Sequence, residues 1–316
     1  MTDTLRPARP IPTSISEAAR AYLALPPAPA IGYPALDDTE GWLKLVEATD
    51  TAIRRRVEGF DLPVTADEQQ IAGVRTYVVR ADGVADDDTT PIYINLHGGA
   101  LISGGGDLCR LMGSVTALTN GMLTWAVDYR MPPLHPYPAA LDDSLAVYRA
   151  ALELRDPGDI FVGGGSAGGN LAAALIVRAK DEGLPMPAAL VLTTPEIDLT
   201  ESGDTFHTLD GIDSGLSSLM QVNLLYANGH DLADPYLSPL FADVSGFPPT
   251  FLQAGTRDLF LSNAIRMHRK LLAAQAETEL HVFEAMPHGG FGGATPEDLE
   301  VRAAIRRFLD KHRRAS

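Results

Sequence analysis

Short apolar runs alternate along the chain with longer segments in which apolar residues recur at helical spacing. Most of the short runs are apolar almost throughout, which is typical of strands buried on both faces. The alternation predicts an α/β fold, with a mostly parallel sheet and helices on both of its faces. The predicted strands are Val74–Val79, Pro91–Leu96, Met122–Val127, Ile160–Gly163, Ala188–Thr193, Thr250–Ala254 and Leu280–Glu284. The predicted helices are Asp107–Thr119, Ala139–Leu154, Asn170–Glu182, Asn263–Ala274 and Pro296–Arg313.

Two segments do not fit the alternation. The first is residues 1–55, with helical patterns near Ser16–Leu25 and Thr39–Arg55, and the second is about 196–230, between two predicted core strands. Long insertions beside a parallel sheet are often lids over an active site. We therefore expect a catalytic domain over residues 56–316 and a helical cap built from both segments. The alternative is that they only cover apolar surface.

The composition is that of a globular protein, with 45% apolar and 21% charged residues. The 41 acidic and 25 basic side chains give a formal net charge of −16, which disfavours nucleic acid and anionic membranes as partners. No apolar run reaches the roughly 18 residues of a membrane span, and the first residues lack the apolar core of a signal peptide. We expect a cytoplasmic location without stable membrane insertion. The single cysteine, Cys109, excludes an internal disulfide and is expected to be buried and structural.

A sharp strand-to-helix turn is predicted around Ser166. Residues 164–168 read Gly-Gly-Ser-Ala-Gly and fit the motif G-x-S-x-G between an apolar strand and a helical pattern. Strand and helix approach closely at such a turn, so Gly164 and Gly168 keep the flanking positions free of side chains. Gly163, Gly165 and Gly168 also fit the dinucleotide fingerprint G-x-G-x-x-G, but that motif needs an acidic residue at the end of the next strand, where Thr193 and Thr194 stand. Ser166 is therefore the candidate nucleophile.

A glycine-rich loop follows an earlier predicted strand and reads His97-Gly98-Gly99-Ala100. Acyl transfer needs backbone N–H groups aimed at the oxyanion of the tetrahedral intermediate. We expect the N–H groups of Gly99, Ala100 and Ala167 to form this oxyanion hole, with Gly98 shaping the loop. His97 has the chemistry of a base, but its position in the loop indicates a structural role.

The base and its acid are sought in loops that follow late strands. Of the eight histidines, His288 stands in a loop directly after a predicted strand, and Asp258 follows the strand before it. The chain order Ser166, Asp258, His288 is that of the α/β-hydrolases. Asp128 and Asp198 also follow strands, but the acid should come from the strand next to the one that bears the histidine. The predicted triad has Ser166 as nucleophile, His288 as base and Asp258 as the orienting acid.

These motifs together resemble the bacterial hormone-sensitive-lipase-like carboxylesterases, a family of the α/β-hydrolase superfamily. The resemblance covers most of the chain and includes Val127–Arg130, His135–Ala140 and Pro195–Thr200. It implies an N-terminal helical cap, hydrolysis of esters with short-to-medium acyl chains, no cofactor, and frequent homodimers. No metal site is predicted. The chain departs from the family at Ala100, where a third glycine is usual, and at Gly165, where an aspartate usually precedes the nucleophile.

The predicted function is that of a serine carboxylesterase acting on a small-molecule ester. A lactonase, an amidase or an acyltransferase could use the same triad, and these alternatives stay open. A non-catalytic ligand-binding protein is a further alternative, because some relatives of the family bind small molecules after losing the triad histidine. His288 is present in this chain, which disfavours that alternative.

Overall fold

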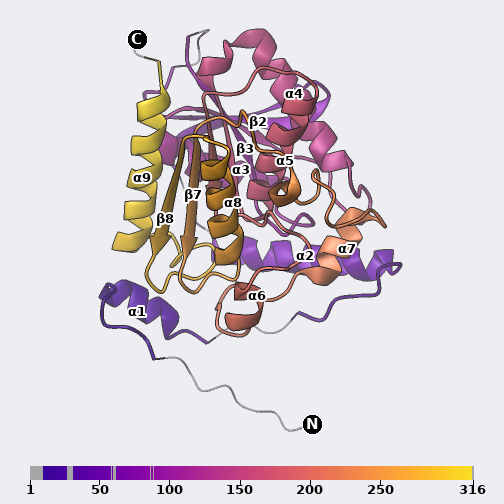
Figure 1. The fold of residues 1–316 in the computed structure, drawn as a ribbon, viewed down its shortest axis with the longest axis vertical. Helices are drawn as coiled ribbons and strands as arrows, with labels where there is room; N and C mark the ends of the chain where they lie inside the picture. Colours follow the sequence, from indigo (N-terminus) through magenta and orange to yellow (C-terminus); the bar gives the residue numbers. More distant parts are fainter. Residues whose placement is uncertain are drawn as a thin grey trace.

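One eight-stranded sheet forms the centre of this computed structural model, which describes residues 10–314 except 27–30, 58, 60, 61, 86 and 88 (Figure 1). The strands are β1 Val64–Ile71, β2 Val74–Ala81, β3 Ile92–Leu96, β4 Leu123–Val127, β5 Ile160–Gly165, β6 Ala189–Thr193, β7 Thr250–Gly255 and β8 Thr278–Phe283. Their order across the sheet is β1-β2-β4-β3-β5-β6-β7-β8. The β1–β2 and β2–β4 pairs are antiparallel and the other pairs are parallel.

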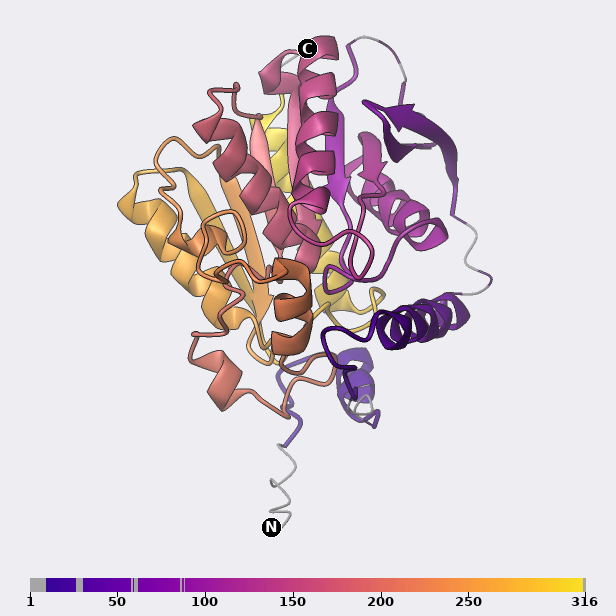
Figure 2. The ribbon, with the colours of Figure 1, turned by 90° about the vertical axis from the view of Figure 1, so that its right-hand side faces the viewer.

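Helices cover both faces of the sheet. The helices of the described residues are α1 Glu17–Leu23, α2 Thr39–Arg56, α3 Asp107–Asn120, α4 Ala139–Leu154, α5 Ala167–Asp181, α6 Thr205–Thr208, α7 Met220–Ala227, α8 Leu261–Ala273 and α9 Pro296–His312, with 3-10 turns at Pro157–Asp159 and Pro239–Phe241. One face carries α3 and α9, and the opposite face carries α4, α5 and α8 (Figures 1 and 2). This is the three-layer arrangement that the sequence predicts.

The central strand β3 explains why both faces are covered. Successive side chains of a strand point to opposite faces, and all five residues of β3 are buried. Ile94 packs in a large apolar cluster with α4 and α5, whereas Tyr93 packs in a second cluster with Phe308 of α9. A strand with two apolar faces needs a helix layer on each of them.

All seven predicted strands and all five predicted core helices are present, with ends shifted by at most three residues. The sequence analysis did not predict β1. Its residues read Val-Thr-Ala-Asp-Glu-Gln-Gln-Ile, and none of them is fully buried. An edge strand that pairs on one side and faces water leaves little apolar signal, so backbone pairing with β2 determines its position.

The two segments outside the alternation both contain helices. Residues 10–26 and 31–55 carry α1 and α2, residues 196–230 carry α6 and α7, and residues 1–9 lie outside the described part of the chain. All four helices lie toward the same end of the molecule (Figures 1 and 2). Trp42 of α2 is fully buried in a cluster with Phe206, Leu219 and Val222 of the second segment. The α2 part of the first segment therefore packs against the second segment.

No helix in the described ranges is both long and apolar enough to cross a lipid bilayer. Cys109 lies in the first turn of α3 and is fully buried, as the sequence predicts.

The packing of α9 on the sheet gives a direct test of this arrangement. Phe308 is 1% exposed and its ring lies 5.5 Å from that of Phe251 on β7. We expect Phe308→Ala to lower the free energy of unfolding by about 3–5 kcal/mol, because it leaves a cavity between helix and strand. Urea unfolding measures this loss. Leu299→Ala on the same helix is the control, since Leu299 is 53% exposed and its loss should cost no more than about 0.5 kcal/mol. Equal losses would contradict the packing.

Candidate active site

Three loops at the ends of parallel strands bring the predicted triad together. Ser166 follows β5, Asp258 follows β7 and His288 follows β8. His288 Nε2 lies 2.9 Å from Ser166 Oγ, and His288 Nδ1 lies 3.1 Å from Asp258 Oδ1. Asp258 is completely buried and the imidazole is 12% exposed. The array has the geometry of a nucleophile, a base and an acid that orients the base.

Ser166 stands in a strained backbone conformation at the turn between β5 and α5. Its φ is 56° and its ψ is −122°, a region that residues with a side chain rarely adopt. A Cβ on Gly168 would lie 1.9 Å from Leu96 O, and one on Gly164 would lie 2.4 Å from the same oxygen. Both glycines are therefore required sterically, as the sequence predicts. The Ser166 hydroxyl is left at the start of α5, next to the unpaired N–H groups of its first turn.

Gly165 replaces the usual aspartate without leaving a gap. A Cβ at this position would lie 2.8 Å from Thr193 Oγ1 on β6. The turn is held from the same side, since Ser166 N–H donates to Thr193 O at 2.9 Å and Glu196 N–H donates to Ser166 O at 3.2 Å. The end of β6 and the segment after it therefore hold the turn through backbone hydrogen bonds, without a carboxylate at position 165.

The glycine-rich loop after β3 lies against Ser166. The Cβ position of Gly98 is 3.6 Å from Ser166 Cβ, so a side chain there would crowd the nucleophile. Gly99 adopts a φ of 132°, and its carbonyl accepts hydrogen bonds from Ile102 N–H and Ser103 N–H at 3.1 and 3.0 Å. Ala100 adopts a φ of 53°, a left-handed conformation that favours glycine. The family's usual third glycine would be less strained at this position.

Helix α2 reaches the same loop. The buried Asp50 accepts a hydrogen bond from Gly104 N–H at 3.0 Å. This contact joins the first of the two non-core segments to the loop that carries Gly98, Gly99 and Ala100.

His97 is buried beneath the loop. Its Nδ1 donates to Gly98 O at 2.8 Å, and its ring stacks on Tyr129 with centroids 4.1 Å apart. The Tyr129 hydroxyl donates to His97 O at 2.6 Å. Burial lowers the pKa of the His97 imidazole, which keeps it neutral. These contacts support the interpretation of His97 as a structural residue of the loop.

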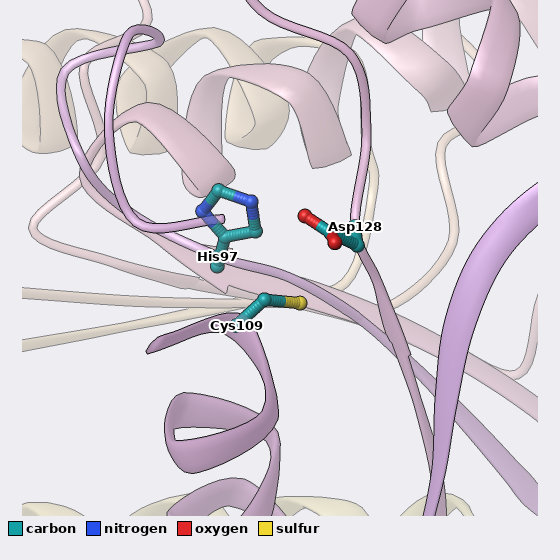
Figure 3. A group of neighbouring side chains, drawn as sticks. All are labelled: His97, Cys109 and Asp128. Carbon is teal, nitrogen blue, oxygen red and sulfur yellow. The ribbon is translucent and has the colours of Figure 1, made fainter. Parts of the chain in front are cut away.

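One group in the described part of the chain places histidine, cysteine and aspartate ligand atoms within 4.8 Å of one another: His97, Cys109 and Asp128 (Figure 3). The Asp128 carboxylate already pairs with Arg75 and accepts a hydrogen bond from Gly106 N–H at 3.0 Å. Burial raises the pKa of the Cys109 thiol well above its ordinary value, whereas a metal needs the thiolate. These three residues are therefore better explained as buried structural support for the glycine-rich loop after β3 than as metal ligands.

The two rival acids have other partners. Asp128 pairs with Arg75 of β2, and Asp198 accepts hydrogen bonds from Ser202 Oγ and Arg266 Nη1, each at 2.6 Å. Asp258 is the carboxylate that bonds to the His288 ring. The acid does come from the strand that neighbours β8, as the sequence analysis requires.

The electrostatics of His288 favour its charged form. Burial by itself lowers the pKa of the imidazole, but the charge and hydrogen bond of Asp258 raise it. The charge of Asp213 adds to this effect, as does that of Glu196 when Glu196 is ionised. The net result is a pKa above the ordinary value of 6.5. Neither Asp213 nor Glu196 is predicted from the sequence as a member of the site. Glu196 lies in the Pro195–Thr200 stretch that resembles the family, whereas nothing in the local sequence marks Asp213.

Glu196 is a fully buried carboxyl group beside the nucleophile turn. Within the described ranges, neither of its side-chain oxygens has a hydrogen-bond partner. Burial raises its pKa to about 8, and the Asn223 amide nearby opposes the shift. Its backbone is firmly held, because its carbonyl accepts a hydrogen bond from Asn170 Nδ2 at 2.8 Å. At neutral pH the group is therefore mostly protonated.

An apolar cluster lies beside the triad. Ala100 and Phe260 pack in the same cluster as Trp42 of α2 and Phe206 and Leu219 of the second non-core segment. The Phe260 ring contacts the His288 ring edge-to-face, with centroids 4.9 Å apart. The surroundings of the nucleophile are therefore apolar on the side where α2, α6 and α7 gather.

Comparison with known proteins agrees with this geometry. A family model described as an alpha/beta hydrolase fold matches residues 93–291. An esterase of Acinetobacter venetianus is 35% identical over 67% of this chain and 69% of its own. The crystal structure of an esterase E25 has a TM-score of 0.88 at 33% identity, covering 97% of this chain and 98% of that one. An esterase of the bacterial hormone-sensitive lipase family has a TM-score of 0.76 at 30% identity, covering 93% and 95%.

The buried Glu196 carboxyl makes stability depend on pH. Its folded-state pKa of about 8 lies above its ordinary value of 4.5, so the folded protein loses stability as the pH rises through this window. Glu196→Gln cannot ionise and keeps the shape of the side chain. We expect its stability relative to the wild type to increase by up to roughly 5 kcal/mol between about pH 5 and about pH 9, at about 1.4 kcal/mol per pKa unit.

Urea unfolding at the two pH values measures the change. The exposed Glu300→Gln is the control and should show the same small difference at both. A Glu196→Gln difference that does not vary with pH would show that the carboxyl is not held in its neutral form.

Proposed function

We propose a mechanism for this chain. The chain belongs to the α/β-hydrolase family, and it is a carboxylic ester hydrolase related to the hormone-sensitive-lipase esterases. The fold and the resemblance predicted from the sequence are confirmed by these relationships. The proposal is that the chain hydrolyses esters of short-to-medium acyl chain length through a covalent acyl-enzyme on Ser166. The continuous hydrogen-bonded array from Ser166 through His288 to Asp258 carries this proposal.

In the first half of the reaction, Ser166 Oγ attacks the ester carbonyl carbon. His288 Nε2, which lies 2.9 Å away, takes the hydroxyl proton as the new C–O bond forms. The imidazolium then gives this proton to the leaving alcohol as the ester C–O bond breaks. Asp258 accepts a hydrogen bond from Nδ1 and stabilises the positive charge on the ring.

In the second half, a water molecule replaces the alcohol. His288 takes a proton from the water as its oxygen attacks the acyl carbon, and then returns the proton to Ser166 as the carboxylic acid leaves. The acyl group is transferred to water and no oxidation or reduction occurs, so the steps balance without a cofactor.

The tetrahedral intermediates carry an oxyanion that needs fixed N–H donors. We assign this role to the N–H groups of Gly99, Ala100 and Ala167. The position of Gly98 against Ser166 Cβ supports the assignment, because it brings the loop to the nucleophile. The Ala167 N–H belongs to the first turn of α5, where it has no partner inside the helix.

The substrate class follows from the surroundings of the triad. The apolar cluster that joins Ala100 and Phe260 to Trp42 and Leu219 suits an acyl chain rather than a charged group. Both non-core segments contribute to this cluster, which supports their assignment as a cap over the site. As a cap, the two segments would lie over the strand ends that carry the triad. A covered site favours small esters over lipid aggregates.

The triad assignment is tested by two substitutions. Ser166→Ala removes the nucleophile, and Asp258→Asn leaves the imidazole in the wrong tautomer. With p-nitrophenyl butyrate, we expect Asp258→Asn to lower kcat by on the order of 10⁴-fold and Ser166→Ala by on the order of 10⁶-fold. Asp143→Asn is the matched control, since Asp143 is also a buried aspartate but its carboxylate pairs with Arg130. Full activity of the Ser166→Ala enzyme, with the alanine confirmed by mass spectrometry, would end the proposal.

The substrate proposal is tested with a series of p-nitrophenyl esters from acetate to palmitate. We expect kcat/KM to be highest for short-to-medium chains and to fall for the longest chains, because side chains of both cap segments pack in one cluster with Phe260. Matched anilides and lactones, assayed in parallel, should react more slowly than the esters. A preference for a lactone or an anilide would replace the carboxylesterase assignment while leaving the triad intact.

A further inference from the structure

A second aspartate, Asp213, joins the two loops that carry the acid and the base. It lies between α6 and α7, in the segment inserted after β6, and is 7% exposed. Its Oδ2 accepts a hydrogen bond from Leu259 N–H at 2.8 Å, directly after Asp258. Both of its oxygens lie 3.3 Å from His288 N–H. One carboxylate therefore contacts the backbone of both loops.

Asp213 is itself held in place. Its Oδ1 accepts a hydrogen bond from Gly215 N–H at 2.9 Å, and its own N–H donates to Leu209 O at 3.2 Å. Gly215 lies close to the other side of the His288 backbone, with its Cβ position 3.3 Å from His288 O. The inserted segment therefore contacts the catalytic histidine from two directions.

The hydrogen bonds of the Asp213 carboxylate are all with N–H donors, so its ionised form is the better acceptor. Burial raises the pKa of Asp213, while the nearby His288 charge and the N–H groups of Gly215 and Leu259 oppose the rise. The ionisable groups that face this pair are Asp258 and Glu196 around His288, and Tyr22 of α1 beside Asp213. Removal of the Asp213 charge lowers the pKa of the His288 imidazole.

We propose that Asp213 is a positioning residue, which fixes the His288 loop against the Asp258 loop and so sets the geometry of the imidazole for catalysis. This inference rests on the triad proposed above. Asp213 touches backbone N–H groups only, so it acts through His288 and Asp258 rather than on the substrate. It also makes the inserted segment a structural part of the triad in addition to its role in the cap.

Two substitutions separate the effect of the position of the Asp213 carboxylate from the effect of its charge. Asp213→Asn keeps the shape of the side chain but has one acceptor oxygen for donors on three segments, and its NH₂ group must face another N–H. We expect kcat to fall by roughly 10- to 100-fold, since small misplacements of catalytic groups have effects of this size, with KM little changed. We expect the acid limb of the kcat/KM profile to lie above pH 6.5 in the wild type, because the pKa of His288 is raised, and to move to lower pH in this variant.

Asp213→Glu is the second variant and covers the case in which Asp213→Asn does not fold. It keeps the charge but moves the carboxylate outward by one methylene. We expect kcat to fall while the acid limb stays near the wild-type pH. The Nδ1 proton of His288, which is seen downfield in the proton NMR spectrum when it is hydrogen-bonded to Asp258, should shift or broaden in both variants.

Asp198→Asn is the matched control, because Asp198 is buried in the same segment and bonds to Thr200, Ser202 and Arg266 instead. It should lower thermal stability without moving the acid limb or the Nδ1 proton. The inference would be overturned if the folded Asp213→Asn and Asp213→Glu enzymes kept the wild-type kcat, the wild-type acid limb of the kcat/KM profile and the wild-type resonance of the His288 Nδ1 proton. A Ser166→Ala enzyme that stays active in the same assay would instead refute the proposed function, so the two failures are distinguishable.

Discussion

The close crossing of three backbones at the nucleophile turn constrains the rest of the site. Leu96 O at the end of β3 stands 1.9 Å from where a Cβ of Gly168 would lie, and the Gly164 position is closed by the same oxygen. Because neither position has a side chain, β3, β5 and the start of α5 approach one another directly. This approach places the glycine-rich loop after β3 against Ser166, so the nucleophile and the loop form one unit.

Hydrogen bonds on the side of β6 hold the strained backbone of this turn in place. A residue with a positive φ costs free energy and persists where its surroundings over-determine it. Ser166 exchanges backbone hydrogen bonds with Thr193 and Glu196, and Asn170 Nδ2 bonds to Glu196 O and Leu237 O, both at 2.8 Å. The segment that leaves β6 therefore holds the turn, and the same segment continues into the insertion that reaches His288. A single stretch of chain supports both the nucleophile and the base.

The parts of the structure that the sequence predicts are those with a local signal. Buried strands are apolar throughout, the turn needs its glycines at fixed offsets, and the triad order follows from which strands precede Ser166, Asp258 and His288. Strand β1 has no such signal, because pairing with β2 determines its position and most of its side chains are exposed. Asp213 has none either, since its partners Leu259 and His288 are brought to it only by the fold.

Three carboxyl groups surround one imidazole, and their hydrogen bonds give them different roles. Asp258 accepts the Nδ1 proton and Asp213 accepts backbone N–H groups, whereas the side-chain oxygens of Glu196 have no partner within the described residues. Desolvation without hydrogen bonds favours the neutral acid, so Glu196 contributes little charge at neutral pH. In the proposed mechanism, the imidazolium that forms during attack is then stabilised mainly from the side opposite Ser166. Stabilisation that appears only as this charge develops lowers the barrier rather than tightening ground-state binding.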